Sequence, residues 1–289
     1  MADLEAEITI RDSPENFAKK LSAFFSNQTG AIIAYSGGVD SALLAYTAHL
    51  ALGDQMVAVL ADSPSLARRE YRFAVNFAET HGIPLKIVET DEMENPLYQA
   101  NEGNRCYYCK KSLFEKLEEL KQQFEGALDN SHWPILYGVN TDDLGDHRPG
   151  IQAAKEASIL APYVDLGMDK NAIRAVCAHY NLEIAEKPAM PCMSSRISYG
   201  EKVTVEKLFQ VEKGEDFLYD LGLRVLRVRH HGDTARIEVS PEDFHIILDN
   251  REKISRVFHD LGFVYISLDL DGFKSGSLNA VLDLSDPRD

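Results

Sequence analysis

Apolar residues recur along the chain in two alternating patterns. Short continuous runs, such as residues 31–35, are typical of strands buried on both faces, and longer segments with an apolar residue every three or four positions are typical of amphipathic helices. Strands are predicted at residues 31–35, 55–62, 85–90, 134–139 and 159–162, and helices at 14–27, 65–81, about 105–124 and 170–180. This alternation predicts an α/β fold with a doubly wound parallel sheet.

A different order of elements begins near residue 200. A helix at 203–221 precedes strands at 223–229 and 235–239, which Gly232 and Asp233 join as a hairpin, and two further helices and a last strand at 263–268 follow. This order predicts a smaller α+β domain. We therefore expect a first domain over residues 1–185, a cysteine loop over 186–199, and a C-terminal domain over 200–289 that binds substrate or mediates oligomerisation.

The composition narrows the choice of partners. The chain has 289 residues and a formal net charge of −16, and so acidic a surface repels nucleic acid, which we therefore exclude as a partner. No apolar run is long enough to span a bilayer, and the acidic N-terminus lacks the basic and apolar regions of a signal peptide. We expect a cytoplasmic protein with no membrane partner, whose cysteines do not form structural disulfides.

The most informative stretch joins the first predicted strand to the helix after it. Its sequence is Ser36-Gly37-Gly38-Val39-Asp40-Ser41. Two glycines let the backbone approach an anion closely, and free N–H groups of the first helical turn point toward that anion. The hydroxyls of Ser36 and Ser41 can donate to phosphate oxygens. Asp40 would repel a bare phosphate, which predicts a bridging Mg²⁺. The alternative is an ordinary strand-to-helix turn.

This hexapeptide resembles the PP-loop of ATP pyrophosphatases, which cleave ATP between the α- and β-phosphates and adenylylate a substrate. No lysine follows the glycines, so the stretch is not a Walker loop. The resemblance implies that ATP and Mg²⁺ bind here and that Asp40 takes part in the chemistry.

Polar residues also follow two other predicted strands. Because ligands of such sheets bind at the carboxyl ends of strands, Asp62 and Ser63 are candidates for holding the adenosine, unless they only cap the next helix. Asn140 and Asp142 follow the fourth strand and can ligate Mg²⁺ or bind ribose, unless they form only a polar turn. Arg148 can neutralise pyrophosphate charge.

Cys192 lies in a proline-bounded loop among hydroxyl side chains, close to Arg196 and Lys187. A cation beside a thiol lowers its pKa and raises the thiolate fraction, so Cys192 is a candidate reactive cysteine. The alternative is a loop cysteine of no consequence. Cys177 lies on the apolar face of a predicted helix and is expected to pack in the core.

Basic residues cluster on the strand predicted at 223–229 and directly after it. They are Arg224, Arg227, Arg229, His230 and His231. The cluster is small and suits one anionic small molecule, and the alternative is a solvated strand face.

Five segments in chain order together resemble the LarE family. They are Ser-Gly-Gly-Val-Asp-Ser, Asn-Arg-Cys-Tyr-Tyr-Cys-Lys, Asn-Thr-Asp-Asp-Leu-Gly-Asp-His-Arg-Pro-Gly, Pro-Cys-Met-Ser-Ser-Arg and Arg-Val-Arg-His-His-Gly-Asp-Thr-Ala-Arg-Ile-Glu-Val. LarE proteins are sulfur transferases that act in the synthesis of the nickel-pincer nucleotide. This nucleotide is the cofactor of lactate racemase. The resemblance implies adenylylation of the carboxylates of pyridinium-3,5-biscarboxylic acid mononucleotide and their conversion to thiocarboxylates. It also implies a homo-oligomer, such as a hexamer.

The resemblance further implies roles for individual residues. The anionic nucleotide substrate would bind to Ser195, Arg196, Arg227, Arg229 and Arg236, and beside them Glu215 and Glu238 would form a carboxylate metal site.

The sulfur would pass through Cys192, for which two routes are open. Either Cys192 sacrifices its own sulfur, or a [4Fe-4S] cluster on Cys106, Cys109 and Cys192 carries sulfide. The C-x2-C pair and a third cysteine favour the cluster, because three thiolates leave one iron open. Zinc is the alternative metal.

Two other functions compete with this interpretation. A PP-loop tRNA thiolase combines the same loop with cysteines but requires a broad basic surface, against which the net charge of −16 argues. A nucleotide-binding regulator without turnover would need neither Asp40 nor Cys192.

Overall fold

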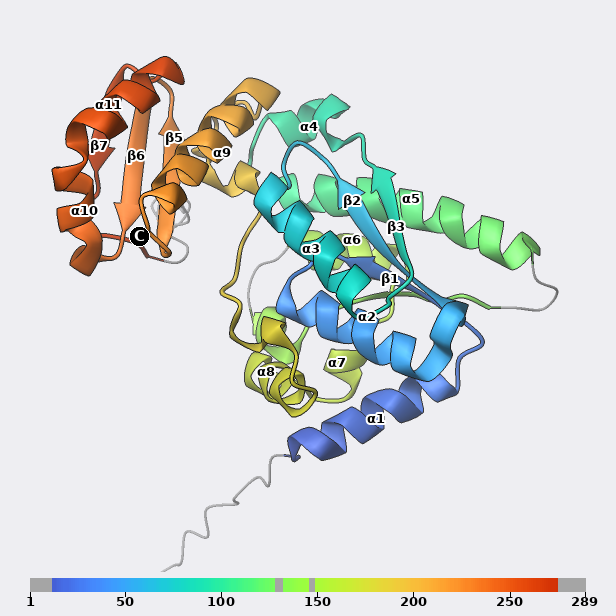
Figure 1. Ribbon diagram of the computed structural model, residues 1–289. Helices are drawn as coiled ribbons and strands as arrows, with labels where there is room; N and C mark the ends of the chain where they lie inside the picture. Colours follow the sequence, from blue (N-terminus) through green and yellow to red (C-terminus); the bar gives the residue numbers. More distant parts are fainter. Residues whose placement is uncertain (1–11, 128–131, 146–148, 275–289) are drawn as a thin grey trace, which may run out of the picture.

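The computed structural model describes residues 12–127, 132–145 and 149–274, so Arg148 lies outside the described residues. Figure 1 shows a larger body around a four-stranded parallel sheet and a smaller C-terminal domain around a three-stranded mixed sheet. The predicted α/β fold with a second α+β domain is confirmed. The domain boundaries at residues 185 and 199 stay a prediction.

The sheet of the larger body has the strand order β3-β2-β1-β4, and all neighbouring strands run parallel. Its strands are β1 (Ala31–Tyr35), β2 (Met56–Asp62), β3 (Leu85–Glu89) and β4 (Ile135–Tyr137). The predicted strand at 159–162 is reduced to one parallel bridge between Leu136 and Leu160. It ends there because Pro162 lacks an N–H group for further pairing and instead begins the short helix α7 (Pro162–Asp165).

Helices cover both faces of this sheet because β1 and β2 are apolar on both faces. Ile33 and Leu60 pack with α1, α2, α3 and α8 on one face, and Ile32 and Val59 pack with α5 and α6 on the other. The helices are α1 (Pro14–Ser26), α2 (Val39–Leu52), α3 (Arg68–Thr80), α4 (Pro96–Gln99), α5 (Arg105–Ala127), α6 (Pro149–Glu156) and α8 (Lys170–His179). Helices on both faces of a parallel sheet are the doubly wound arrangement that the apolar runs predict.

The smaller domain contains the predicted hairpin and a last strand. Its elements are α9 (Val205–Asp220), β5 (Leu226–His231), β6 (Thr234–Val239), α10 (Phe244–Asp249), α11 (Arg251–Asp260) and β7 (Tyr265–Leu268). β6 pairs antiparallel with β5 and parallel with β7. The core of this domain also takes in Met193, Ile197 and Tyr98 of α4, so it continues into the contact with the larger body. None of the helices in the described ranges is long and apolar enough to cross a membrane.

Two glycines permit the tight junction between β1 and α2. Gly37 has a φ of +71°, in the left-handed region that favours glycine, and a Cβ there would lie 2.5 Å from the Cβ of Ala74. Gly138, which follows β4, lies against the backbone of the first turn of α2. A Cβ on Gly138 would lie 2.9 Å from both the carbonyl carbon of Asp40 and the amide nitrogen of Ser41. The end of β4 thus packs directly against the N-terminus of α2.

We expect Gly138→Ala to push α2 away from β4, because the added methyl group meets backbone atoms that cannot rotate aside. Overpacking of this kind costs about 1–3 kcal/mol of unfolding free energy, which urea denaturation would measure. Gly145→Ala is the matched control, because a Cβ at Gly145 meets nothing within 4 Å. Equal stability of the two variants would contradict the close approach at Gly138.

Candidate active site

The loop Ser36–Ser41 joins the carboxyl end of β1 to the start of α2. Gly38 is the N-cap of α2 and makes no side-chain capping hydrogen bond, so no such bond satisfies the N–H groups of the first turn. The Ser41 hydroxyl accepts a hydrogen bond from the Ser36 amide at 3.1 Å and lies 3.1 Å from the Ser36 hydroxyl. Free helix N–H groups beside two hydroxyls are suited to an anion such as phosphate.

Asp40 lies in the first turn of α2, and groups from two other elements contact its carboxylate. The ammonium of Lys170, at the start of α8, lies 2.5 Å from Asp40 Oδ2, and the Asn140 amide donates to Oδ1 at 3.3 Å. The backbone N–H of Lys170 donates to Asp142 at 3.0 Å. The fold therefore brings Asn140 and Asp142 to the loop, where they were predicted to lie. Lys170 was not predicted, because a lysine in the first turn of a helix carries no distinguishing sequence signal.

Asp62 and Ser63 lie at the end of β2, on the same edge of the sheet. Asp62 Oδ1 lies 2.7 Å from a guanidinium nitrogen of Arg68, which also donates to the Ser63 carbonyl at 3.1 Å. The Ser63 and Ser65 hydroxyls are 2.8 Å apart. The structure thus places this pair on the expected edge, and Arg68 is its charged neighbour. Contact with adenosine stays a prediction.

Residues 185–196 connect the two bodies and include Cys192; we call them the strap. In Figure 1 the strap is part of the yellow-to-gold connection from α8 to α9. Between the short 3-10 helices Glu183–Glu186 and Met193–Arg196, residues 187–192 form no helix or strand. Arginine side chains donate to carbonyl groups along the strap. Arg174 donates to Ala185 and Lys187, Arg227 to Ala189, Arg196 to Pro191 and Cys192, Arg105 to Ser194, and Arg229 to Ser195. Charged donors are strong partners for carbonyl groups that no ladder satisfies.

Buried carboxylates hold two of these arginines in place. The guanidinium of Arg196 makes a two-point pair with Glu215, with N–O distances of 3.0 and 3.1 Å. Arg229 pairs with Glu238 at 2.8 Å, and Arg236 pairs with the same carboxylate at 2.9 Å. The predicted substrate residues therefore do gather in one place. Several of them contact one another and the strap, and Arg236, whose side chain is 30% exposed, is the most open of these three arginines.

The thiols of Cys106, Cys109 and Cys192 share one neighbourhood at the start of α5. Desolvation raises the pKa of Cys109 to about 12, and the electrostatic interaction with Cys192 adds to this rise. Desolvation and the charge of Cys192 likewise raise the pKa of Cys106. Among residues 12–127, 132–145 and 149–274, no three His, Cys, Asp or Glu side chains already stand in a metal-binding arrangement. Thiols are the donor type that an iron–sulfur cluster requires, but these three do not stand in a metal-binding arrangement.

The strap also forms hydrogen bonds with the larger body. The Tyr98 hydroxyl lies 2.6 Å from the Ser194 hydroxyl, and the Met193 amide donates to the Ser65 carbonyl at 2.8 Å. The ammonium of Lys187 donates to the Gly37 carbonyl of the loop at 3.0 Å. The contacts of Lys187 therefore do not support the expectation that it activates Cys192, because its ammonium contacts the loop Ser36–Ser41. Cys177 is fully buried in the core, as predicted.

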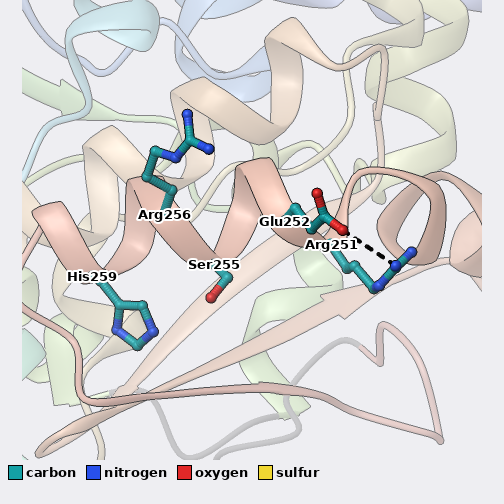
Figure 2. Close-up of a pocket in the computed structure, with 5 residues that line it drawn as sticks. All are labelled: Arg251, Glu252, Ser255, Arg256 and His259. Carbon is teal, nitrogen blue, oxygen red and sulfur yellow. Dashed lines mark hydrogen bonds and ion pairs between the residues drawn. The ribbon is translucent and has the colours of Figure 1, made fainter.

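A shallow hollow on α11 contains none of the predicted site residues. Figure 2 shows its lining side chains, which are Arg251, Glu252, Ser255, Arg256 and His259. In Figure 1, α11 lies on the far side of the smaller domain from the parallel sheet. This hollow is therefore separate from the loop and the strap.

Comparison with known proteins gives the family. The family model of NAD synthase matches residues 15–114, which include the loop Ser36–Ser41. The chain is 32% identical over 251 residues to the pyridinium-3,5-bisthiocarboxylic acid mononucleotide synthase of Lactiplantibacillus plantarum, covering 86% of this chain and 89% of that protein. The chain belongs to the LarE family.

Two further relatives of this LarE-family chain are uncharacterized proteins. One, from Synechocystis, is 43% identical over 270 residues, which are 93% of this chain and 98% of that protein. The other, from Methanocaldococcus jannaschii, is 29% identical over 244 residues, which are 84% of this chain and 90% of that protein. The similarity extends over both bodies and the strap, so the LarE resemblance of the separate motifs reflects one continuous relationship.

In this LarE-family chain we expect Glu215→Gln to destabilise the fold, because it leaves the buried Arg196 guanidinium without a countercharge. Breaking a buried ion pair costs about 3–5 kcal/mol, which urea denaturation would measure. Glu252→Gln is the control, because Glu252 forms an exposed pair with Arg251 and should change stability little. A small effect of Glu215→Gln would contradict its role as the internal partner of Arg196.

Proposed function

We propose that the protein is an ATP-dependent sulfur transferase of nickel-pincer nucleotide synthesis. Its substrate would be pyridinium-3,5-biscarboxylic acid mononucleotide, whose carboxylates it would convert to thiocarboxylates. The observation that carries the proposal is the attachment of the Cys192 strap to the phosphate-binding edge. Lys187 contacts the Gly37 carbonyl at 3.0 Å, and the Met193 amide contacts the Ser65 carbonyl at 2.8 Å. The product named for the Lactiplantibacillus relative agrees with this chemistry.

The first half-reaction requires activation of a carboxylate, because oxide is a poor leaving group. A substrate carboxylate oxygen would attack the α-phosphorus of ATP, forming an acyl-adenylate and releasing pyrophosphate. The N–H groups of Gly38 and the first turn of α2, with the hydroxyls of Ser36 and Ser41, would stabilise the phosphate charge. Lys170, 2.5 Å from Asp40, supplies a cation at the same place.

Mg²⁺ fits this edge by donor type, because Asp40 and Asp142 both offer hard oxygen ligands there. The two side chains are linked through Lys170, which contacts one with its ammonium and the other with its backbone N–H. Mg²⁺ binds through one or two carboxylates together with substrate phosphates, so two carboxylates suffice. When bound, it would neutralise the departing pyrophosphate.

In the second half-reaction a sulfur nucleophile attacks the acyl carbon, and AMP leaves with the carboxylate oxygen. We propose that Cys106, Cys109 and Cys192 hold a [4Fe-4S] cluster, which would supply sulfide from the iron that no cysteine binds. The sacrifice of Cys192 itself is the other route. In either case the arginine-held strap would keep Cys192 close to the edge of the sheet where ATP is proposed to bind. Arg236, whose side chain is 30% exposed, can contact the anionic substrate.

We expect Cys192→Ala to abolish thiocarboxylate formation while pyrophosphate release continues, because the Cys192 thiol belongs to the sulfur step and not to the phosphate loop. Malachite-green detection after pyrophosphatase treatment and mass analysis of the nucleotide product would measure the two steps. Cys177→Ala, which changes a core cysteine, should retain both. Loss of both activities in Cys192→Ala alone would assign Cys192 a structural role.

The two sulfur routes differ in the mass and iron content of the protein. If the cluster supplies the sulfur, anaerobically purified protein contains about four irons per chain and keeps its mass through turnover. Sacrifice of Cys192 instead lowers the intact mass by about 34 Da, the mass of H₂S. We expect the iron-containing protein with unchanged mass. Iron-free protein that loses this mass on turnover would contradict the cluster.

A further inference from the structure

We propose that Lys187 is a positioning residue that fixes the Gly37–Gly38 peptide of the loop for binding of the ATP phosphates. The proposal rests on the proposed use of ATP. Lys187 lies in the strap, 150 residues away from Gly37 in sequence, and its ammonium donates to the Gly37 carbonyl at 3.0 Å. No motif points to this contact.

The planarity of the peptide bond explains how this contact acts on the phosphate site. In a trans peptide the C=O and the next N–H point in opposite directions, so holding the Gly37 carbonyl fixes the direction of the Gly38 N–H. That N–H donates a long hydrogen bond, of 3.4 Å, to the Ser36 hydroxyl of the same loop. Lys187 therefore holds the carbonyl on one side of the peptide. The Gly38 N–H, which would donate to an ATP phosphate, lies on the other side.

A peptide between two glycines needs such a restraint. Neither residue has a Cβ, so rotation of the peptide plane meets little steric resistance. Gly37 is confined on one side by Ala74, but that contact restrains the position of the residue and not the direction of its carbonyl. The lysine supplies the directional restraint, because a charge-assisted hydrogen bond favours one orientation of the carbonyl.

The Lys187 side chain is itself held firmly. Its ammonium lies 2.7 Å from Glu70 of α3 and 3.6 Å from the centroid of the Phe73 ring, and the side chain is only 11% exposed. Burial lowers the pKa of Lys187, and the Glu70 carboxylate opposes this shift. At the backbone, Arg174 donates to the Lys187 carbonyl at 2.8 Å. Both ends of the side chain are thus fixed, as positioning through a flexible lysine requires.

The experiment compares the binding of ATP and of adenosine by isothermal titration calorimetry in the presence of Mg²⁺. Loss of one oriented N–H to a charged phosphate weakens binding about tenfold, so we expect Lys187→Met to weaken ATP by about tenfold or more. Adenosine, which has no phosphate, should bind as to the wild type. An effect confined to ATP separates phosphate positioning from a general loss of structure.

The control is Lys20→Met, because Lys20 also pairs with a carboxylate, Asp12, and lies near a ring, that of Phe17, but is part of α1. It should change neither affinity. If Lys187→Met does not fold, Glu70→Gln serves in its place, because it weakens the hold on the ammonium and should also weaken ATP selectively. Lys187→Arg, which keeps a charged donor, should restore part of the ATP affinity.

Three outcomes would overturn the proposal. They are unchanged ATP affinity in the folded Lys187 and Glu70 variants, equal losses for ATP and adenosine, or the same loss in Lys20→Met. The wild-type protein keeps this test separate from the proposed function. If the wild type binds no ATP, the ATP-dependent function fails; if it binds ATP and the variants bind equally well, only the positioning role of Lys187 fails.

Discussion

The hydrogen bonds from arginine side chains to the carbonyl groups of the strap are the interactions on which the site depends. A buried segment with only short helical turns leaves many carbonyl groups without a backbone partner, and here charged donors satisfy several of them. Arg105 comes from the larger body and Arg229 from the smaller domain, and they donate to Ser194 and Ser195 respectively. The position of Cys192 is therefore set by both bodies together. Glu215 and Glu238 are needed because the buried guanidinium groups of Arg196 and Arg229 require a countercharge.

The parallel sheet supplies the other half of the site. Parallel strands end at one edge, so the loop after β1, the Asp62–Ser63 pair after β2 and Asn140 after β4 meet there. The strap contacts this edge through Lys187 and Met193. The segment that contains Cys192, which we propose acts in the sulfur step, is thus attached to the loop that we propose binds phosphate. This attachment gives a physical reason for the two proposed steps, adenylylation and sulfur delivery, to occur in one place.

Local patterns were enough to predict part of this arrangement. The strands of the parallel sheet and the hairpin have clear apolar runs, and the loop Ser36–Ser41 combines a turn requirement with a helix start, so each can be recognised without the fold. The charged partners are different, because any acidic residue can pair with any basic one until the fold selects them. Lys187 was assigned to Cys192 by its proximity in sequence, whereas the fold places it against Gly37 and Glu70. The arginines of β5 were assigned to substrate, whereas Arg229 also holds Glu238 and the strap.

We propose that two steps occur in succession on one carboxylate: adenylylation at the loop Ser36–Ser41 and sulfur delivery at the strap. The most direct test uses pyridinium-3,5-biscarboxylic acid mononucleotide labelled with ¹⁸O in its carboxylates, incubated with the protein, ATP, Mg²⁺ and sulfide. Mass spectrometry of the released AMP then reports the origin of its oxygen. Activation by adenylylation predicts one ¹⁸O in each AMP formed with thiocarboxylate, because the carboxylate oxygen leaves with the phosphate. Thiocarboxylate formed together with unlabelled AMP would contradict the account.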